Sequence, residues 1–129
     1  MENNNPNNNI KWVGVAILAV VVVIAVMLLL PKSSASKYKN LDVFAQCLTE
    51  KGAVMYGAYW CSHCKAQKQA FGTAFKSIKY IECTEDPKSC EIAGIQGYPT
   101  WKIGDEVLIG EQPLEFLAEK AQCLLEKVI

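Results

Sequence analysis

The chain has 129 residues, about half of them hydrophobic, and its thirteen lysines balance thirteen acidic residues, so the formal net charge is zero. It contains no arginine, the residue that dense phosphate recognition and base readout normally use, and nucleic acid is therefore excluded as an expected partner. The length predicts one domain with attachments, and six cysteines in so short a chain predict a compartment where thiols are oxidised.

The first thirty residues divide into a polar tail and an apolar run. Residues 1–9 are mostly asparagine, and because they have nothing to bury we predict that they are disordered. Residues 10–30 are the predicted transmembrane anchor, since no charged residue occurs from Trp12 to Leu30. About nineteen helical residues reach roughly 28 Å, close to the thickness of a bilayer core. Membrane lipid is thus a predicted partner of this segment.

A secretory signal peptide is the alternative interpretation of the same run. Its apolar region would be roughly 7 to 15 residues long and would follow a basic segment, whereas this run is longer and follows only Lys11. Ser33-Ser34-Ala35 offers only a weak cleavage site. We therefore expect an uncleaved anchor, followed by a polar tether over residues 31–39.

The lysines and the cysteines favour opposite orientations of this anchor. Lys32, Lys37 and Lys39 follow the span and only Lys11 precedes it, so the positive-inside rule places the rest of the chain in the cytoplasm. The cysteine content favours the oxidising side. We give the cysteines more weight, because three lysines are a modest bias. The predicted location is the cell membrane, crossed once, with the domain on the extracytoplasmic side.

Residues 40–129 are predicted to form the folded domain. Apolar residues at helical spacing predict a helix over Leu41–Lys51, capped by Asn40 or Asp42. The apolar and aromatic run over residues 53–60 predicts a buried strand.

The motif Cys-Ser-His-Cys at residues 61–64 lies between this strand and a helix predicted over residues 65–76. The free N–H groups and partial positive charge of a helix N-terminus stabilise a thiolate, so Cys61 is the candidate nucleophile. His63 would act in the same direction when protonated. Cys64 lies one helical turn further in and suits the resolving role. We therefore predict thiol–disulfide chemistry with Cys61, Cys64 and His63 as catalytic residues.

Other functions of the same motif are a structural disulfide or half of a zinc site. Zinc needs about four ligands, but the chain has no second Cys-x-x-Cys motif and His63 is its only histidine. No metal and no cofactor are therefore predicted. Two further alternatives remain: a metallochaperone that binds Cu(I) through Cys61, Cys64 and His63, since soft thiolates select that ion, and a non-enzymatic adaptor that disulfides stabilise.

The rest of the chain alternates strands and helices. The expected elements are a strand over 79–83, a helix over 86–94, a turn over 95–100, a hairpin over 101–110, and a last helix whose apolar stripe runs from Leu114 to Val128. This order predicts an α/β fold, a mixed sheet with helices on both faces. The motif would lie at the C-terminal end of a central strand, where sites of α/β proteins occur.

Two segments of the chain resemble known motifs. Trp60-Cys-x-x-Cys64 followed by Gly97-Tyr98-Pro99-Thr100 resembles the active-site and cis-proline loops of the thioredoxin fold. The longer runs, residues 55–64 and 94–101, are similar to the thioredoxin-like domain fused to, or encoded beside, bacterial vitamin K epoxide reductase homologues. This resemblance covers about residues 41–123. It implies disulfide exchange with cysteine-containing protein substrates outside the cytoplasm, and a quinone-linked membrane partner that reoxidises the cysteine pair.

The resemblance also implies roles for single residues. Cys61 becomes the attacking thiol and Cys64 its resolving partner. Trp60, Tyr98 and Pro99 become substrate-binding residues, with a cis Pro99 holding Tyr98 so that its backbone pairs with an extended substrate. An ordinary trans turn at Pro99 is the alternative.

The chain departs from the family pattern at two positions. Ser62 stands where proline is common in the oxidase-like version, which would shift the redox potential. Met55 stands where many thioredoxins keep a buried carboxylate that helps to deprotonate the second cysteine. Resolution at Cys64 would then be slower, or another base would serve it.

Four cysteines remain outside the motif. With the motif pair kept free to cycle, the fifteen possible pairings of six cysteines reduce to three. The related domains carry a bridge similar to Cys83–Cys90, and Cys47–Cys123 follows by elimination. Buried free thiols are the alternative, because unpaired cysteine is often buried.

Overall fold

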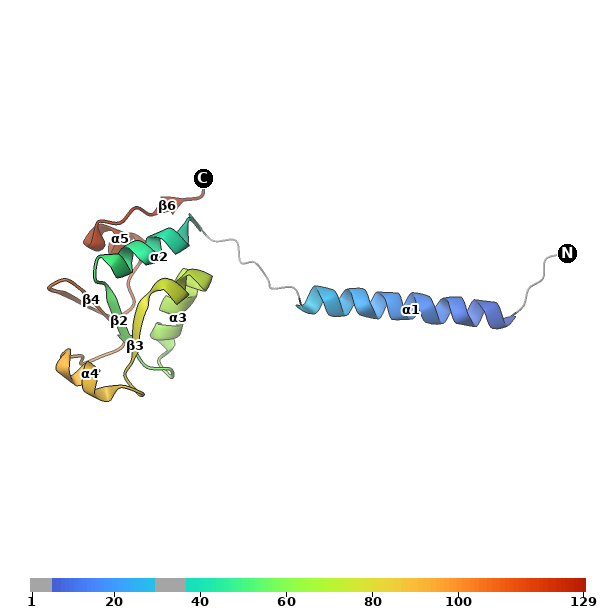
Figure 1. The fold of residues 1–129 in the computed structure, drawn as a ribbon, viewed down its shortest axis with the longest axis horizontal. Helices are drawn as coiled ribbons and strands as arrows, with labels where there is room; N and C mark the ends of the chain where they lie inside the picture. The colour runs from blue at the N-terminus through green and yellow to red at the C-terminus, as the bar shows by residue number, and fades with distance from the viewer. Residues whose placement is uncertain (1–5, 30–36) are drawn as a thin grey trace. The chain divides into compact units, whose positions relative to one another are not determined.

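The computed structural model describes residues 6–29 and 37–129. They belong to two compact units, which divide between Ala35 and Ser36: a single helix, and an α/β domain (Figure 1). Residues 1–5 of the predicted tail, Leu30 at the end of the predicted anchor, and residues 31–36 of the predicted tether lie outside the described residues.

The first unit is helix α1, Pro6–Leu29. It begins before the predicted anchor, so residues 6–9 form its first turn and do not belong to a disordered tail. Proline suits this place, because its ring presets φ and the first helical N–H needs no partner. Side chains from Lys11 to Leu29 are exposed, and this stretch is long and apolar enough to cross a membrane. The apolar run is therefore a candidate span.

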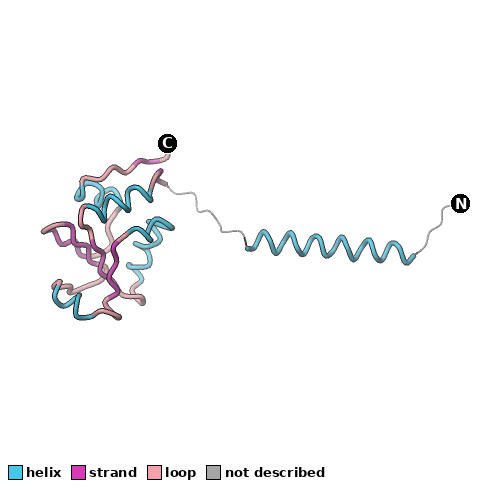
Figure 2. Tube along the Cα trace, in the orientation of Figure 1, coloured by secondary structure: helices cyan, strands magenta, loops and turns pink. Residues whose placement is uncertain are grey.

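The second unit contains a mixed sheet with helices around it (Figures 1 and 2). Its strand order is β3-β2-β4-β5, with β2 parallel to β3 and antiparallel to β4, and this confirms the predicted fold class. The elements in chain order are β1 (Tyr38–Lys39), α2 (Leu41–Glu50), β2 (Val54–Gly57), α3 (Ser62–Phe71), the 3₁₀ helix η1 (Gly72–Ser77), β3 (Lys79–Glu82), α4 (Pro87–Ile92), β4 (Thr100–Ile103), β5 (Glu106–Ile109), α5 (Leu114–Ala121) and β6 (Glu126–Lys127).

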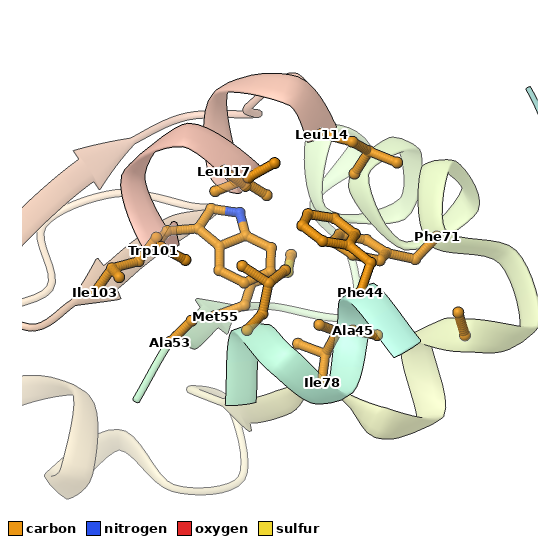
Figure 3. Close-up of a cluster of buried hydrophobic side chains, with 14 of the residues drawn as sticks. Phe44, Ala45, Ala53, Met55, Phe71, Ile78, Trp101, Ile103, Leu114 and Leu117 are labelled. Carbon is orange, nitrogen blue, oxygen red and sulfur yellow. The ribbon is translucent and has the colours of Figure 1, made fainter. Parts of the chain in front are cut away.

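Each face of the sheet has its own apolar cluster. Met55 and Trp101 are partners across β2 and β4, and they pack with side chains of α2, α3 and α5 (Figure 3). The ring of Phe71 lies 5.9 Å from the rings of both Phe44 and Trp101. Tyr56 faces the other way, because side chains alternate along a strand, and it packs with Cys83 and Cys90. Each face of the sheet thus carries packed side chains, and β2 lies inside the sheet between β3 and β4.

The helix predicted after the motif begins at Ser62, directly after Cys61 as expected, but its predicted end at Lys76 is wrong, because the α-helix ends at Phe71. Gly72 has φ of 55°, which a glycine adopts without steric cost, and the chain continues as η1. The tighter winding still buries Ala74 against the core, which explains why the apolar spacing extended further than the α-helix.

The last helix also ends earlier than its apolar stripe predicted. It stops at Ala121, Gln122 takes a left-handed conformation, and Leu124 and Val128 are exposed. Two long-range interactions account for this end. Cys123 is joined to Cys47, and β6 pairs antiparallel with β1.

The predicted tether is wrong at Tyr38–Lys39, which form β1 against β6. The hydroxyl of Tyr38 donates to Glu115 over 2.5 Å, and the ammonium groups of Lys37 and Lys127 lie 3.4 and 3.5 Å from the same carboxylate. We call these four residues the terminal clasp. They join the start of the domain to α5 and β6.

Acid is expected to weaken the terminal clasp. The hydrogen bond from Tyr38, aided by Lys37, lowers the pKa of Glu115 from its ordinary value of 4.5 to about 2. Because the folded-state pKa is the lower one, the stabilisation is complete above pH 4.5 and is lost as the pH falls toward 2. Thermal unfolding should therefore show a lower Tm for Glu115→Gln near neutral pH, with the difference from wild type shrinking in acid. A difference that stays constant down to pH 2 would contradict this assignment.

Candidate active site

The motif lies where β2 gives way to α3. The strand ends at Gly57, and Cys61 occupies the N-cap position of α3 with extended backbone angles. The backbone N–H of Cys64 donates a hydrogen bond to the Cys61 sulfur over 3.2 Å. The sulfur therefore lies at the free N–H groups of the first helical turn, where negative charge is stabilised.

The two thiols differ in burial and in electrostatic environment. Both are unbridged in the structure, with Cys61 7% exposed and Cys64 1% exposed. Burial, together with the hydrogen bond to Cys61, raises the pKa of the Cys64 thiol to about 12, and the charge of Lys68 acts weakly in the opposite direction. Cys64 is thus a protonated thiol at neutral pH, and Cys61 is the less buried of the two residues. This arrangement fits an attacking Cys61 and a resolving Cys64.

His63 is exposed at the start of α3 and faces an acidic residue. Its Nδ1 lies 3.4 Å from an Oε2 oxygen of Glu111, which follows β5. Exposed pairs of this kind contribute little to stability. Glu111 was not predicted, because it is 48 positions from His63 and no local pattern connects them.

The structure brings the predicted substrate-binding residues together. The Tyr98–Pro99 peptide bond is cis. Trp60 is 58% exposed, and its ring meets the ring of Tyr98 edge-on with centroids 5.9 Å apart. The Pro99 carbonyl accepts a hydrogen bond from the N–H of Gly110, which attaches this loop to the end of β5. The loop before β4 and the loop before Cys61 therefore share one surface.

Tyr80 and Glu82 form a hydrogen-bonded pair on β3, and Tyr80 lies near Cys64; neither residue was predicted to belong to the site. The hydroxyl of Tyr80 donates to Oε2 of Glu82 over 2.7 Å. The other carboxylate oxygen of Glu82 accepts from the backbone N–H of Tyr59 at 3.0 Å and from the hydroxyl of Thr84 at 2.7 Å. The period of two along the strand places Tyr80 and Glu82 on one face, which is the only signal that the sequence contained.

The remaining cysteines form two bridges in the structure. Cys47–Cys123 joins α2 to the segment that follows α5, and Cys83–Cys90 joins the end of β3 to α4. Both lie outside the motif, so Cys61 and Cys64 are left to react with each other. Within residues 6–29 and 37–129, no group of three or more His, Cys, Asp or Glu side chains is placed to hold a metal ion.

Comparisons with known proteins agree with this geometry. The family model described as thioredoxin matches residues 35–122. Thiol-disulfide oxidoreductase LTO1 of Arabidopsis thaliana is 47% identical over 96 residues, which cover 67% of this chain and 25% of that protein. Protein disulfide-isomerase of Aspergillus niger is 34% identical over 71 residues, 48% of this chain and 14% of the fungal protein. The chain thus spans a quarter or less of these relatives, and the matches support thiol–disulfide oxidoreductase chemistry at the cysteine pair.

Proposed function

The chain belongs to the thioredoxin family, and from this we propose that it is a membrane-anchored thiol–disulfide oxidoreductase whose domain acts on the extracytoplasmic side. The observation that carries the proposal is the placement of Cys61 at the N-cap of α3, with Cys64 buried one turn behind it. A stabilised thiolate beside a second thiol is what disulfide exchange requires.

The exchange proceeds in two steps. The Cys61 thiolate attacks a disulfide of a protein substrate, forming a mixed disulfide and releasing one substrate thiolate, which takes up a proton. Cys64 then loses its proton and attacks the Cys61 sulfur, releasing the second substrate thiolate and closing the Cys61–Cys64 disulfide. Two electrons pass from the pair to the substrate, and the reverse sequence oxidises a substrate dithiol.

The anchor and the two structural bridges support the proposed location. Residues 10–30 would cross the membrane, residues 31–36 would connect the anchor to the domain, and residues 37–129, which include β1, would carry the activity. A domain with bridges at Cys47–Cys123 and Cys83–Cys90 suits a compartment in which thiols are oxidised.

A membrane partner completes the proposed cycle. A pair that oxidises secreted proteins becomes reduced in each turn and needs an electron acceptor. The similarity of residues 55–64 and 94–101 to domains associated with vitamin K epoxide reductase homologues favours a quinone-linked membrane oxidoreductase in this role. Transfer would take place by disulfide exchange through Cys61.

One experiment on the full chain in its native membrane tests location and activity together. A membrane-impermeant thiol reagent applied to intact cells after mild reduction should label Cys61. Membranes should also catalyse the refolding of a substrate protein whose native disulfides have been reduced. A Cys61→Ser, Cys64→Ser double variant is the matched control. Labelling that appears only after lysis would overturn the location, and Cu(I) binding without exchange would favour the metallochaperone instead. Neither exchange nor copper binding would favour the adaptor.

A further inference from the structure

The second step of exchange requires the buried Cys64 thiol to lose its proton. Cys64 must become a thiolate at the moment it attacks, yet its burial favours the neutral thiol. Met55, fully buried in the central strand, supplies no carboxylate to take the proton. The structure must therefore provide another route for a proton to leave the Cys64 sulfur.

Gly57, at the end of β2, shows what lies beside Cys64. A Cβ atom built on this glycine would lie 2.9 Å from the Cys64 sulfur and 3.1 Å from the hydroxyl oxygen of Tyr80. The thiol and the phenol thus border the same small space, which only a residue without a side chain leaves open. Gly57 is also the β-sheet partner of Glu82, so the pairing of β2 with β3 fixes the positions of Tyr80 and Glu82 relative to Gly57.

The phenol connects this space to a carboxylate. Tyr80 donates to Glu82 over 2.7 Å. Burial alone would raise the pKa of Glu82, but hydrogen bonds from Tyr80 and Thr84 lower it below the ordinary value of 4.5, so the carboxylate is ionised at neutral pH. The Lys68 ammonium lies 3.6 Å from the centroid of the Tyr80 ring. Its positive charge favours the thiolate form of Cys64. Cys61, Lys68 and Glu82 are the titratable groups that interact with the Cys64–Tyr80 pair.

Building on the proposed function, we propose that Tyr80 is the group through which Cys64 loses and regains its proton, with Glu82 as the base at the end of this relay. As the Cys64 sulfur attacks Cys61, its proton passes to the Tyr80 oxygen while the Tyr80 proton passes to Glu82. The Cys64–Cys61 bond forms, the bond from Cys61 to the substrate sulfur breaks, and the substrate leaves as a thiolate. Glu82 then releases the proton to solvent, and in the reverse reaction the same atoms return it.

A chromogenic disulfide separates the two steps. An aromatic disulfide whose thiol product absorbs visible light reacts with reduced protein to release one thiol when Cys61 attacks and a second when Cys64 resolves. For Tyr80→Phe in the full chain, we expect an unchanged first phase and a second phase slowed by at least about tenfold at pH 7. The wild-type second phase should vary little between about pH 6 and pH 8, because Glu82 is already ionised. In Tyr80→Phe it should rise about tenfold per pH unit, because hydroxide then removes the proton.

Two further variants make the result specific. Glu82→Gln should reproduce the steep pH dependence of the second phase while keeping the phenol. Tyr56→Phe is the matched control, since it removes a hydroxyl from β2 on the opposite face of the sheet, and it should leave both phases unchanged. Equal second-phase rates and equal pH slopes in wild type and Tyr80→Phe would overturn the relay. Absence of any thiol release from wild type would contradict the proposed function itself.

Discussion

Replacing Cys61 with serine is expected to abolish disulfide exchange to the level of a control without protein, whereas Cys64→Ser should arrest the reaction halfway. Cys61, at the N-cap of α3, is the less buried of the two cysteines, and a hydroxyl at that position is not ionised near neutral pH. Cys64 is buried behind it and has no route to a protein substrate before Cys61 has reacted. Loss of Cys61 therefore removes the first step, and loss of Cys64 removes only the second.

Mass spectrometry and non-reducing gels can distinguish these outcomes. Cys64→Ser should accumulate mixed disulfides with substrate proteins, every one of them through Cys61. Cys61→Ser should accumulate none, although its folding is expected to be intact, because the two structural bridges do not involve the motif. Adducts formed through Cys64 in the Cys61→Ser variant would reverse the assigned roles.

Removing the Cys47–Cys123 bridge is expected to cause the largest loss of stability among the changes considered. The bridge joins residues 76 positions apart, and closing a loop of that length restricts the unfolded chain strongly. The entropic estimate is roughly 4 to 5 kcal/mol, against about 2 kcal/mol for Cys83–Cys90, whose residues are only 7 positions apart. The bridge also fastens the segment after α5 to α2, so its loss should loosen the terminal clasp.

Denaturant unfolding of the two double variants, Cys47→Ala with Cys123→Ala and Cys83→Ala with Cys90→Ala, tests this order. The first should lose about twice as much free energy of unfolding as the second, and the second should retain its exchange activity. Equal losses would show that strain or local packing, and not loop length, sets the contribution of each bridge. Loss of activity in a folded Cys83→Ala, Cys90→Ala variant would instead assign that bridge to electron transfer.

Local patterns predicted the elements around Cys61 well, because each depends on residues near it in sequence. The apolar run before the motif becomes β2, and Asp86 caps a helix that starts with Pro87. The motif itself specified a strand-to-helix junction, and the structure places Cys61 there.

The errors occur where a distant segment decides the outcome. Apolar spacing predicted that the last helix continues to Val128. Instead, part of that segment forms β6, because it pairs with β1, which lies more than eighty residues earlier in the chain. The Glu82 carboxylate reaches the backbone of Tyr59 only because β2 and β3 lie side by side. A sequence without the strand register contains no sign of such contacts.

The bridge between Cys47 and Cys123 also determines how the domain would respond to tension. A pull applied between residues 37 and 129 travels through β1 and the first turns of α2, crosses the sulfur–sulfur bond, and leaves through β6. Residues 48–122, which contain the whole redox site, lie inside the covalent loop and carry none of that force once the contacts of Glu115 with Lys37, Tyr38 and Lys127 have separated. Only the flanking residues can lengthen, by about 3.5 Å each, so stretching should leave the reactive pair undisturbed until the bridge is reduced.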